Sequence, residues 1–267
     1  MPLNAEKFLP HRKPMLFIDS LAEFSEKYAR AEIKINENNI FLNREGILDP
    51  LAGVEFIAQT AALFSARSMF EKSGTPFSGL LVGLRDFEFF HALKSGNSVS
   101  VEVEKTDEIG AFALFQGKIS SNGKVALSGT IKVWHGTNEA PPPAVKERSV
   151  IEKSTLEKQI SESIKSVEKT NNTIQGTLSF DAGFKGFEGH FPGMPVLPGV
   201  ILMKSVIMFL NGKYALKKIS NAKFSKSVLP GDILKVSASL ENEILKAKVF
   251  SVNTPVASFS MELSSEK

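Results

Sequence analysis

One segment of the sequence places a carboxylate and an amide among residues expected to be buried. The segment PLAGVEFIAQTAALFSA, residues 50–66, is apolar on almost all sides of a helix, yet it holds Glu55 and Gln59 one turn apart. Because burial disfavours the charged form of a carboxyl group, we expect the pKa of Glu55 to be raised. Carboxyl groups with a shifted pKa are enriched at working sites, so Glu55 is a candidate for proton transfer.

A second apolar segment, PGVILMKSVIMFL at residues 198–210, holds one charged residue, Lys204. On the helix pattern alone, Glu55 and Lys204 have an alternative structural interpretation. Their side chains would then extend along the protein surface or pair across a helix interface.

A rigid loop, GFEGHFPGMPVLPGV at residues 186–200, holds His190 and leads into the second helix. It closely resembles the loop of hot-dog-fold 3-hydroxyacyl-[acyl-carrier-protein] dehydratases, where His-Phe-Pro-Gly is followed by Pro-Gly-Val and the central helix. LPHRKPMLFID, residues 9–19, looks like the opening of the same family, and GVEFIAQTAA, residues 53–62, looks like its helix.

The resemblance implies a catalytic His on the loop of one hot dog and a carboxylate on the central helix of its partner. Within each copy the family carries this acid fourteen positions after the His. In this sequence the position fourteen after His190 is Lys204, and the position fourteen before Glu55 is Phe41. Each half has therefore lost the opposite member, which implies one composite site of His190 and Glu55 and a degenerate second site of Phe41 and Lys204. This division is also similar to the dehydratase pair of bacterial aryl polyene and flexirubin-type pigments, here fused in one chain.

Eliminating water from a 3-hydroxyacyl thioester needs a base, an acid and stabilisation of charge on the thioester oxygen. The resemblance implies that His190 is the base and that a protonated Glu55 gives the hydroxyl its proton, although the two roles can be exchanged. Gly199 resembles the backbone oxyanion donor, and Gln59 is expected to orient Glu55. The alternatives are a structural role for His190, helix packing for Gly199 and a satisfied buried amide for Gln59.

The elements that position these residues occur twice. The Pro-rich stretch within 139–150 predicts a linker between an N-terminal domain, 1–138, and a C-terminal domain, 151–267. Segments after the two helices match at an offset of 135 residues, for instance Phe89 with Phe224. Because each helix is followed by strands without further helices, we predict an α+β fold, a double hot-dog of two antiparallel sheets around central helices.

Residue patterns give the expected elements of each half. They are strand-like alternation over Met15–Ile35, a helix over Pro50–Phe70, a hairpin over Ser163–Phe180 turning at Asn171 and Asn172, and a helix over Pro198–Leu210.

Composition excludes several classes of function. The chain has 267 residues, no Cys and a scattered net charge of +3, so thiol chemistry is excluded and a nucleic-acid partner is disfavoured. No signal sequence or membrane-spanning run is recognisable, so we expect a cytoplasmic protein. The remaining histidines, His11, His91 and His135, are expected to be structural or on the surface. The proposed chemistry needs no cofactor, and no motif with the spacing of metal ligands is present.

These observations predict a dehydratase that acts on 3-hydroxyacyl thioesters of acyl carrier protein in fatty-acid or polyene biosynthesis. Basic residues near the entrance of the site would guide the acidic carrier. Two alternatives stay open, namely a hot-dog acyl thioesterase and a noncatalytic subunit that binds the carrier. The chain is expected to form an intrachain pseudo-dimer, with further homo-oligomers as an option.

Overall fold

The computed structural model describes residues 4–73, 78–136, 155–212 and 214–265. The expected linker, 139–150, lies outside the described residues, as do the domain boundaries on either side of it. Those boundaries stay predictions.

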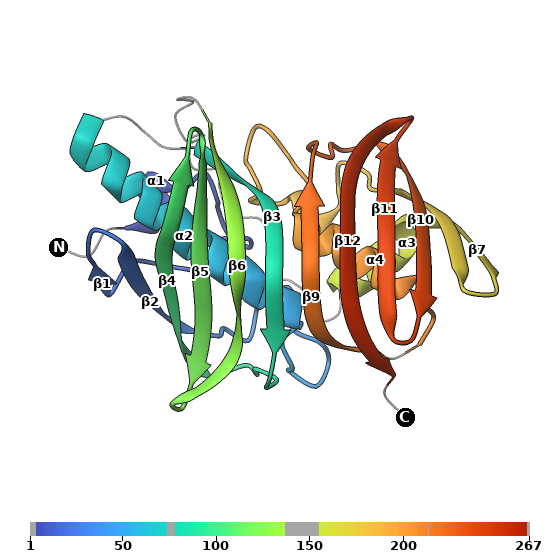
Figure 1. The fold of residues 1–267 in the computed structure, drawn as a ribbon, viewed down its shortest axis with the longest axis horizontal. Coiled ribbons are helices and arrows are strands. Elements are labelled where there is room, and N and C mark those ends of the chain that lie inside the picture. Colours follow the sequence, from blue (N-terminus) through green and yellow to red (C-terminus); the bar gives the residue numbers. More distant parts are fainter. Residues whose placement is uncertain (1–3, 74–77, 137–154, 213, 266–267) are drawn as a thin grey trace.

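The strands of both halves join into one antiparallel sheet (Figure 1), in the order β1-β2-β4-β5-β6-β3-β9-β12-β11-β10-β8-β7. The strands of the first half are β1 Glu23–Phe24, β2 Tyr28–Lys34, β3 Ser78–Phe89, β4 Ser98–Ile109, β5 Phe112–Ser121 and β6 Lys124–Gly136. Those of the second half are β7 Ile164–Thr170, β8 Thr173–Ser179, β9 Tyr214–Phe224, β10 Ile233–Glu241, β11 Ile244–Ser251 and β12 Thr254–Ser265.

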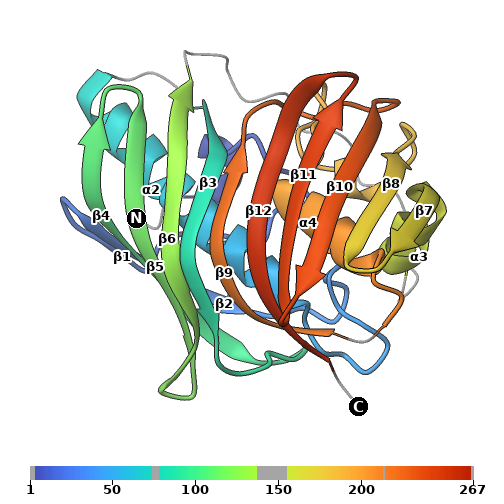
Figure 2. The ribbon, with the colours of Figure 1, turned by 45° about the vertical axis from the view of Figure 1, so that its right-hand side comes forward.

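The two central helices lie against the same face of this sheet (Figure 2). Helix α2 spans Pro50–Ser73 and α4 spans Gly199–Met208, close to the helices that the sequence predicts. Helix α2 contacts all strands from β2 to β6 and also α4, which explains why its sequence is apolar on almost every side. The predicted α+β double hot-dog is confirmed. Among the described helices, none is both long and apolar enough to cross a membrane.

Three shorter elements were not expected from the sequence. They are helix α1, Ala5–Phe8, helix α3, Thr155–Ser163, and the 3-10 turn η1, Lys185–Phe187. Helix α1 contacts α2, and α3 contacts both α4 and η1.

The hairpin expected in the second half is confirmed, because β7 and β8 pair around a turn at Asn171 and Asn172. The strand-like region expected over Met15–Ile35 is only partly correct, since residues 15–22 form no strand. Part of their backbone is bonded to the side chain of Gln59 instead. The carbonyl of Met15 accepts from Gln59, and the N–H of Phe17 donates to Gln59, at 2.7 and 3.0 Å.

Strands β3 and β9 join the two halves by antiparallel pairing. Gly83 lies opposite Lys223, and Glu88 lies opposite Lys218. With the offset of 135 residues between the halves, Lys223 is the equivalent of Glu88 and Lys218 the equivalent of Gly83. The pairing is therefore symmetric about a pseudo-twofold axis, as expected for a duplicated domain.

Helix α2 approaches β5 closely at Gly117. A Cβ atom added at this residue would lie 2.3 Å from Cγ2 and 3.0 Å from Cδ1 of Ile57. Because a β-branched side chain in a helix has one strongly preferred χ1 rotamer, Ile57 cannot turn away cheaply. Glycine at residue 117 thus sets how near the sheet the helix carrying Glu55 can lie.

We therefore expect Gly117→Ala to lower the free energy of unfolding by roughly 1–3 kcal/mol, the usual cost of overpacking a core. The measurement is urea denaturation followed by circular dichroism. Gly183→Ala is the control, because an added Cβ there meets only a side-chain oxygen of Asp181 at 3.2 Å. Equal midpoints for the Gly117 variant and the unchanged protein would contradict this account of the helix position.

Candidate active site

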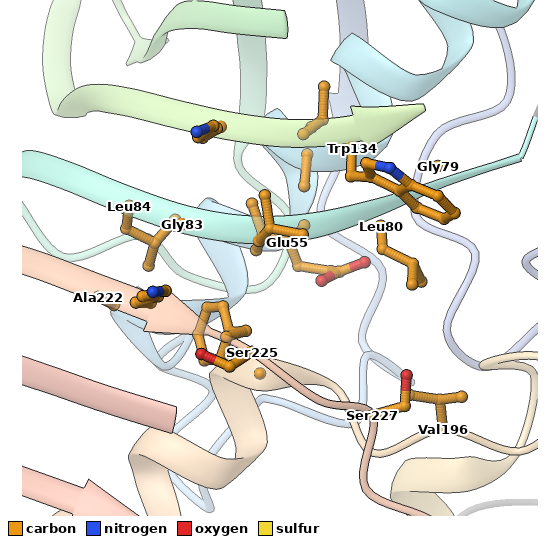
Figure 3. Close-up of a pocket in the computed structure, with 18 of the residues that line it drawn as sticks. Glu55, Gly79, Leu80, Gly83, Leu84, Trp134, Val196, Ala222, Ser225 and Ser227 are labelled. Carbon is orange, nitrogen blue, oxygen red and sulfur yellow. The ribbon is translucent and has the colours of Figure 1, made fainter. Parts of the chain in front are cut away.

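A cavity of about 860 Å³ lies where the two halves meet (Figure 3). Glu55 projects into it between Leu80 and Trp134 of the first half and Ser225 of the second half. The wall is formed by α2, β3, β6, the end of β9 and the loop before α4. All four residues predicted for the composite site line this cavity: Glu55, Gln59, His190 and Gly199.

Gln59 fixes the carboxylate of Glu55 to the N-terminal segment. Its amide Nε2 donates to Glu55 Oε1 at 2.9 Å and to the carbonyl of Met15 at 2.7 Å. Its oxygen accepts from the N–H of Phe17 at 3.0 Å. The fully buried amide thus makes three hydrogen bonds, which fix its orientation. The geometry supports the orienting role expected for Gln59, and the amide is also satisfied in the structural sense.

His190 presents one ring nitrogen to the cavity because the other is bonded to the backbone. Its Nδ1 lies 2.7 Å from the carbonyl of Val196. A carbonyl only accepts, so Nδ1 carries the hydrogen and Nε2 of the neutral ring keeps its lone pair. Burial lowers the pKa of His190 to about 4, although the charge of Glu55 acts in the opposite direction. The ring is therefore neutral at neutral pH and suited to accept a proton.

The structure brings His190 of the second half next to Glu55 of the first. Ligand atoms of these two residues and of His11 all lie within 4.8 Å of one another. A single bound molecule can thus touch both His190 and Glu55. His190 and Glu55 were expected to meet, whereas His11 was expected to be structural or on the surface.

The pKa expected for Glu55 is wrong in direction. Burial alone would raise it, but the hydrogen bonds from His11 and Gln59 and the two neighbouring imidazole rings outweigh burial. The pKa of Glu55 is consequently lowered, and its carboxyl group is ionised at neutral pH. A helix sequence does not reveal these partners, because two of them lie on distant segments.

His11 is the residue at this cavity that sequence reasoning did not place there. Its Nε2 lies 3.5 Å from Glu55 Oε1, and only 6% of the residue is exposed. It lies in the segment that resembles the family's opening, and that position was the available signal. His91 and His135 are absent from the cavity wall.

Backbone contact holds the His190 loop against the segment that carries His11. The N–H of Arg12 donates to the carbonyl of Gly189 at 2.9 Å. Gly189 has φ +81°, and a Cβ there would come within 2.0 Å of the Arg12 carbonyl oxygen. Only glycine fits this close approach.

Gly199 is the first residue of α4 and lines the cavity. A Cβ atom at this residue would lie 2.6 Å from the ring of Phe224, so packing alone requires a glycine. The N–H groups of a first helical turn lack partners within the helix and form a site for negative charge. Both roles considered for Gly199 are therefore compatible with the structure.

The pseudo-equivalent second site is filled. Phe41 and Lys204 line a space of about 20 Å³ together with Leu156 and Ile160 of α3. Lys204 Nζ lies 2.7 Å from Asp49 and 3.2 Å from Glu157. Burial alone would lower the pKa of Lys204, but these two carboxylates raise it, so the ammonium stays charged.

Charge is reversed between the two sites. At the first, a histidine from outside the helix faces a carboxylate on α2. At the second, carboxylates face a lysine on α4. The carboxylate on α2 thus faces imidazole rings, and the ammonium on α4 faces carboxylates.

The cluster of His11, Glu55 and His190 offers donor atoms that metal ions also accept. In this cluster, however, Glu55 Oε1 already receives the amide N–H of Gln59, and Nδ1 of His190 is bonded to a carbonyl. Such an environment stabilises a carboxylate next to a neutral imidazole. We therefore interpret the cluster as a site for proton transfer.

Comparisons with known proteins agree with the division into two halves. Residues 3–141 match the family model described as ApeP-like, ApeP dehydratase, and residues 166–261 match ApeI-like, ApeI dehydratase.

Two curated relatives each match about a fifth of this chain. A 3-hydroxyacyl-[acyl-carrier-protein] dehydratase FabZ from Clostridium acetobutylicum is 41% identical over 73 residues, 23% of this chain and 49% of the relative. The FabZ of Lactobacillus helveticus is 44% identical over 68 residues, 21% of this chain and 46% of the relative. The chain thus spans about half the length of these relatives.

Solved structures resemble nearly the whole chain. An acyl-ACP thioesterase from Bacteroides thetaiotaomicron has a TM-score of 0.61 at 11% identity, over 89% of this chain and 98% of that one. The dehydratase domain from the CurF module of Curacin polyketide synthase has a TM-score of 0.59 at 10% identity, over 95% and 99%. At these identities the likeness shows the fold alone.

The lowered pKa of His190 makes stability depend on pH. Between the folded value of about 4 and the ordinary value of 6.5, the unfolded chain binds more protons than the folded one. Stability therefore rises with pH in this window, and His190 contributes about 3 kcal/mol at neutral pH that is lost towards about pH 4. Urea denaturation at several pH values measures the slope. In His190→Gln we expect this part of the slope to vanish, and an unchanged slope would contradict the assignment.

Restoring the family's acid at the second site is expected to fail. Lys204→Glu places a carboxyl group beside Asp49 and Glu157, so we expect a loss of roughly 3 kcal/mol or more of stability at neutral pH. The loss should be smaller at acidic pH, where protonation relieves the repulsion. Lys204→Met is the control, since it removes the ion pairs without adding a negative charge. Equal losses for both variants at both pH values would refute the role of charge here.

Proposed function

Because the chain belongs to the ApeP-like dehydratase family, we propose that it removes water from 3-hydroxyacyl thioesters of acyl carrier protein. The product is the trans-2-enoyl thioester. The observation that carries this proposal is the meeting of a neutral imidazole and an ionised carboxylate, from opposite halves, in one apolar cavity. The names of the FabZ relatives support the substrate class.

In the first step His190 acts as the base. Its free Nε2 takes the proton from Cα, and the electron pair of the broken C–H bond moves into the thioester as an enolate. The N–H groups at the start of α4, including that of Gly199, stabilise the charge on the thioester oxygen. The low pKa of His190 keeps the ring neutral before the reaction.

In the second step the bond between Cβ and the hydroxyl oxygen breaks and the double bond forms. The departing hydroxide takes the proton that His190 has received, so water leaves and the ring is neutral again. The ionised Glu55 accepts a hydrogen bond from the 3-hydroxyl group and stabilises the transient imidazolium. This division of roles replaces the protonated Glu55 expected from the sequence, because its pKa is lowered.

Basic residues border the cavity and suit an acidic carrier. Arg85, Lys132, Lys223 and Lys226 line it and are exposed at its edge. Such charges raise the rate of encounter with a partner of opposite charge. We infer that the carrier docks here and inserts its thioester between the halves. We propose a cytoplasmic role in the synthesis of fatty acids or of polyenes.

The test is mass spectrometry of carrier-bound 3-hydroxyacyl thioesters of several chain lengths incubated with the protein. We expect the loss of one water per acyl group, slowed roughly 10²–10⁴-fold in His190→Ala and in Glu55→Gln. His91→Ala is the matched control, because His91 lies outside the cavity wall.

Other outcomes identify the alternatives. Release of the free acid would show a thioesterase. Binding without any change in mass would show a noncatalytic subunit, and binding can be followed separately because the single Trp of the chain, Trp134, lines the cavity.

A further inference from the structure

His11 lies in the cavity wall although the chemistry proposed above does not use it. Its ring lies edge-on to the rings of Phe191 and His190, with centroids 4.9 and 5.3 Å away. Its Nε2 faces Glu55 Oε1 at 3.5 Å, and both side chains are almost fully buried. A long contact of this kind is common before substrate binds and shortens in the complex.

The contact fixes which nitrogen of His11 carries the hydrogen. A carboxylate oxygen only accepts, so Nε2 must donate when the ring is neutral. Nδ1 then carries a lone pair instead of a hydrogen, and among the described residues it has no hydrogen-bond partner. The ring is thus oriented by Glu55 and by the two aromatic neighbours.

We propose that His11 is a positioning residue, whose Nε2–H holds the Glu55 carboxylate as an ionised acceptor facing the cavity. The inference rests on the proposed dehydration, in which Glu55 binds the 3-hydroxyl group of the substrate. Gln59 holds Glu55 Oε1 from the same helix, and His11 holds it from the N-terminal segment. The two donors leave Oε2 for the substrate.

The position of His11 is set by contacts on both sides. Arg12, the next residue, donates its backbone N–H to Gly189 in the His190 loop at 2.9 Å. Gln59 bonds to Met15 and Phe17 further along the same segment. His11 is therefore placed relative to both Glu55 and His190.

The groups that determine the charge of Glu55 are few. Among the described residues, the titratable ones acting on it are His11 from the N-terminal segment and His190 from the loop before α4. The guanidinium of Arg12 is bonded to the carbonyls of Leu9 and His11. Removing His11 should therefore raise the pKa of Glu55, because only His190 and Gln59 would then oppose the effect of burial.

The test compares His11→Phe, which keeps a ring of similar shape without a donor, with His11→Gln, which keeps an N–H donor. In His11→Phe we expect kcat to fall roughly tenfold to a hundredfold with little change in KM. The acid limb of its pH–rate profile should move to higher pH, since Glu55 must be ionised. His11→Gln should restore most of kcat and most of the original position of the acid limb. His91→Phe is the matched control.

A second measurement does not depend on turnover. Infrared titration of the Glu55 carboxyl band, assigned by its loss in Glu55→Gln, should give a higher midpoint in His11→Phe than in the unchanged protein. Equal midpoints overturn the role of His11, whether or not the chain dehydrates any substrate. A shifted midpoint in a protein that removes no water supports the His11 contact and refutes the proposed function instead.

Discussion

The arrangement of this site depends on one constraint, the fixing of the N-terminal segment between the two elements that carry Glu55 and His190. Gln59 binds that segment on one side through the backbone of Met15 and Phe17. Gly189 binds it on the other side through Arg12, at a distance that no other residue type allows. Without this segment, the two side chains would come from halves joined mainly by the pairing of β3 with β9 and by the contact of α2 with α4.

The same segment explains the electrostatics. A carboxylate buried alone in an apolar helix is expected to be neutral. Here donors from Gln59 and His11 converge on Glu55, and the charge is stabilised despite burial. At the second site the charge on the central helix is positive. Asp49 and Glu157 stabilise the ammonium of Lys204, and α3 fills the space. The duplicated fold thus supports a buried carboxylate at one site and a partly buried ammonium at the other.

The sequence was informative wherever local pattern decides structure. The two apolar helices and the hairpin turning at Asn171 follow from hydrophobic pattern and turn residues. The meeting of Glu55 with His190 follows from the family resemblance and from the complementary losses in the two halves. The role of His11 and the lowered pKa of Glu55 did not follow, because they arise from contacts 44 residues or more apart in the chain. The irregular course of residues 15–22 has the same cause, since a side chain replaces a neighbouring strand.

The pairing of β3 with β9 within one polypeptide matters when the protein is dilute. A site assembled from two separate subunits is lost on dilution, because the partners dissociate by mass action. Here both contributors belong to one polypeptide, so their effective concentration is fixed by the fold and is independent of how much protein is present. Each half is also free to change without the same change appearing in the other, as Phe41 and Lys204 illustrate.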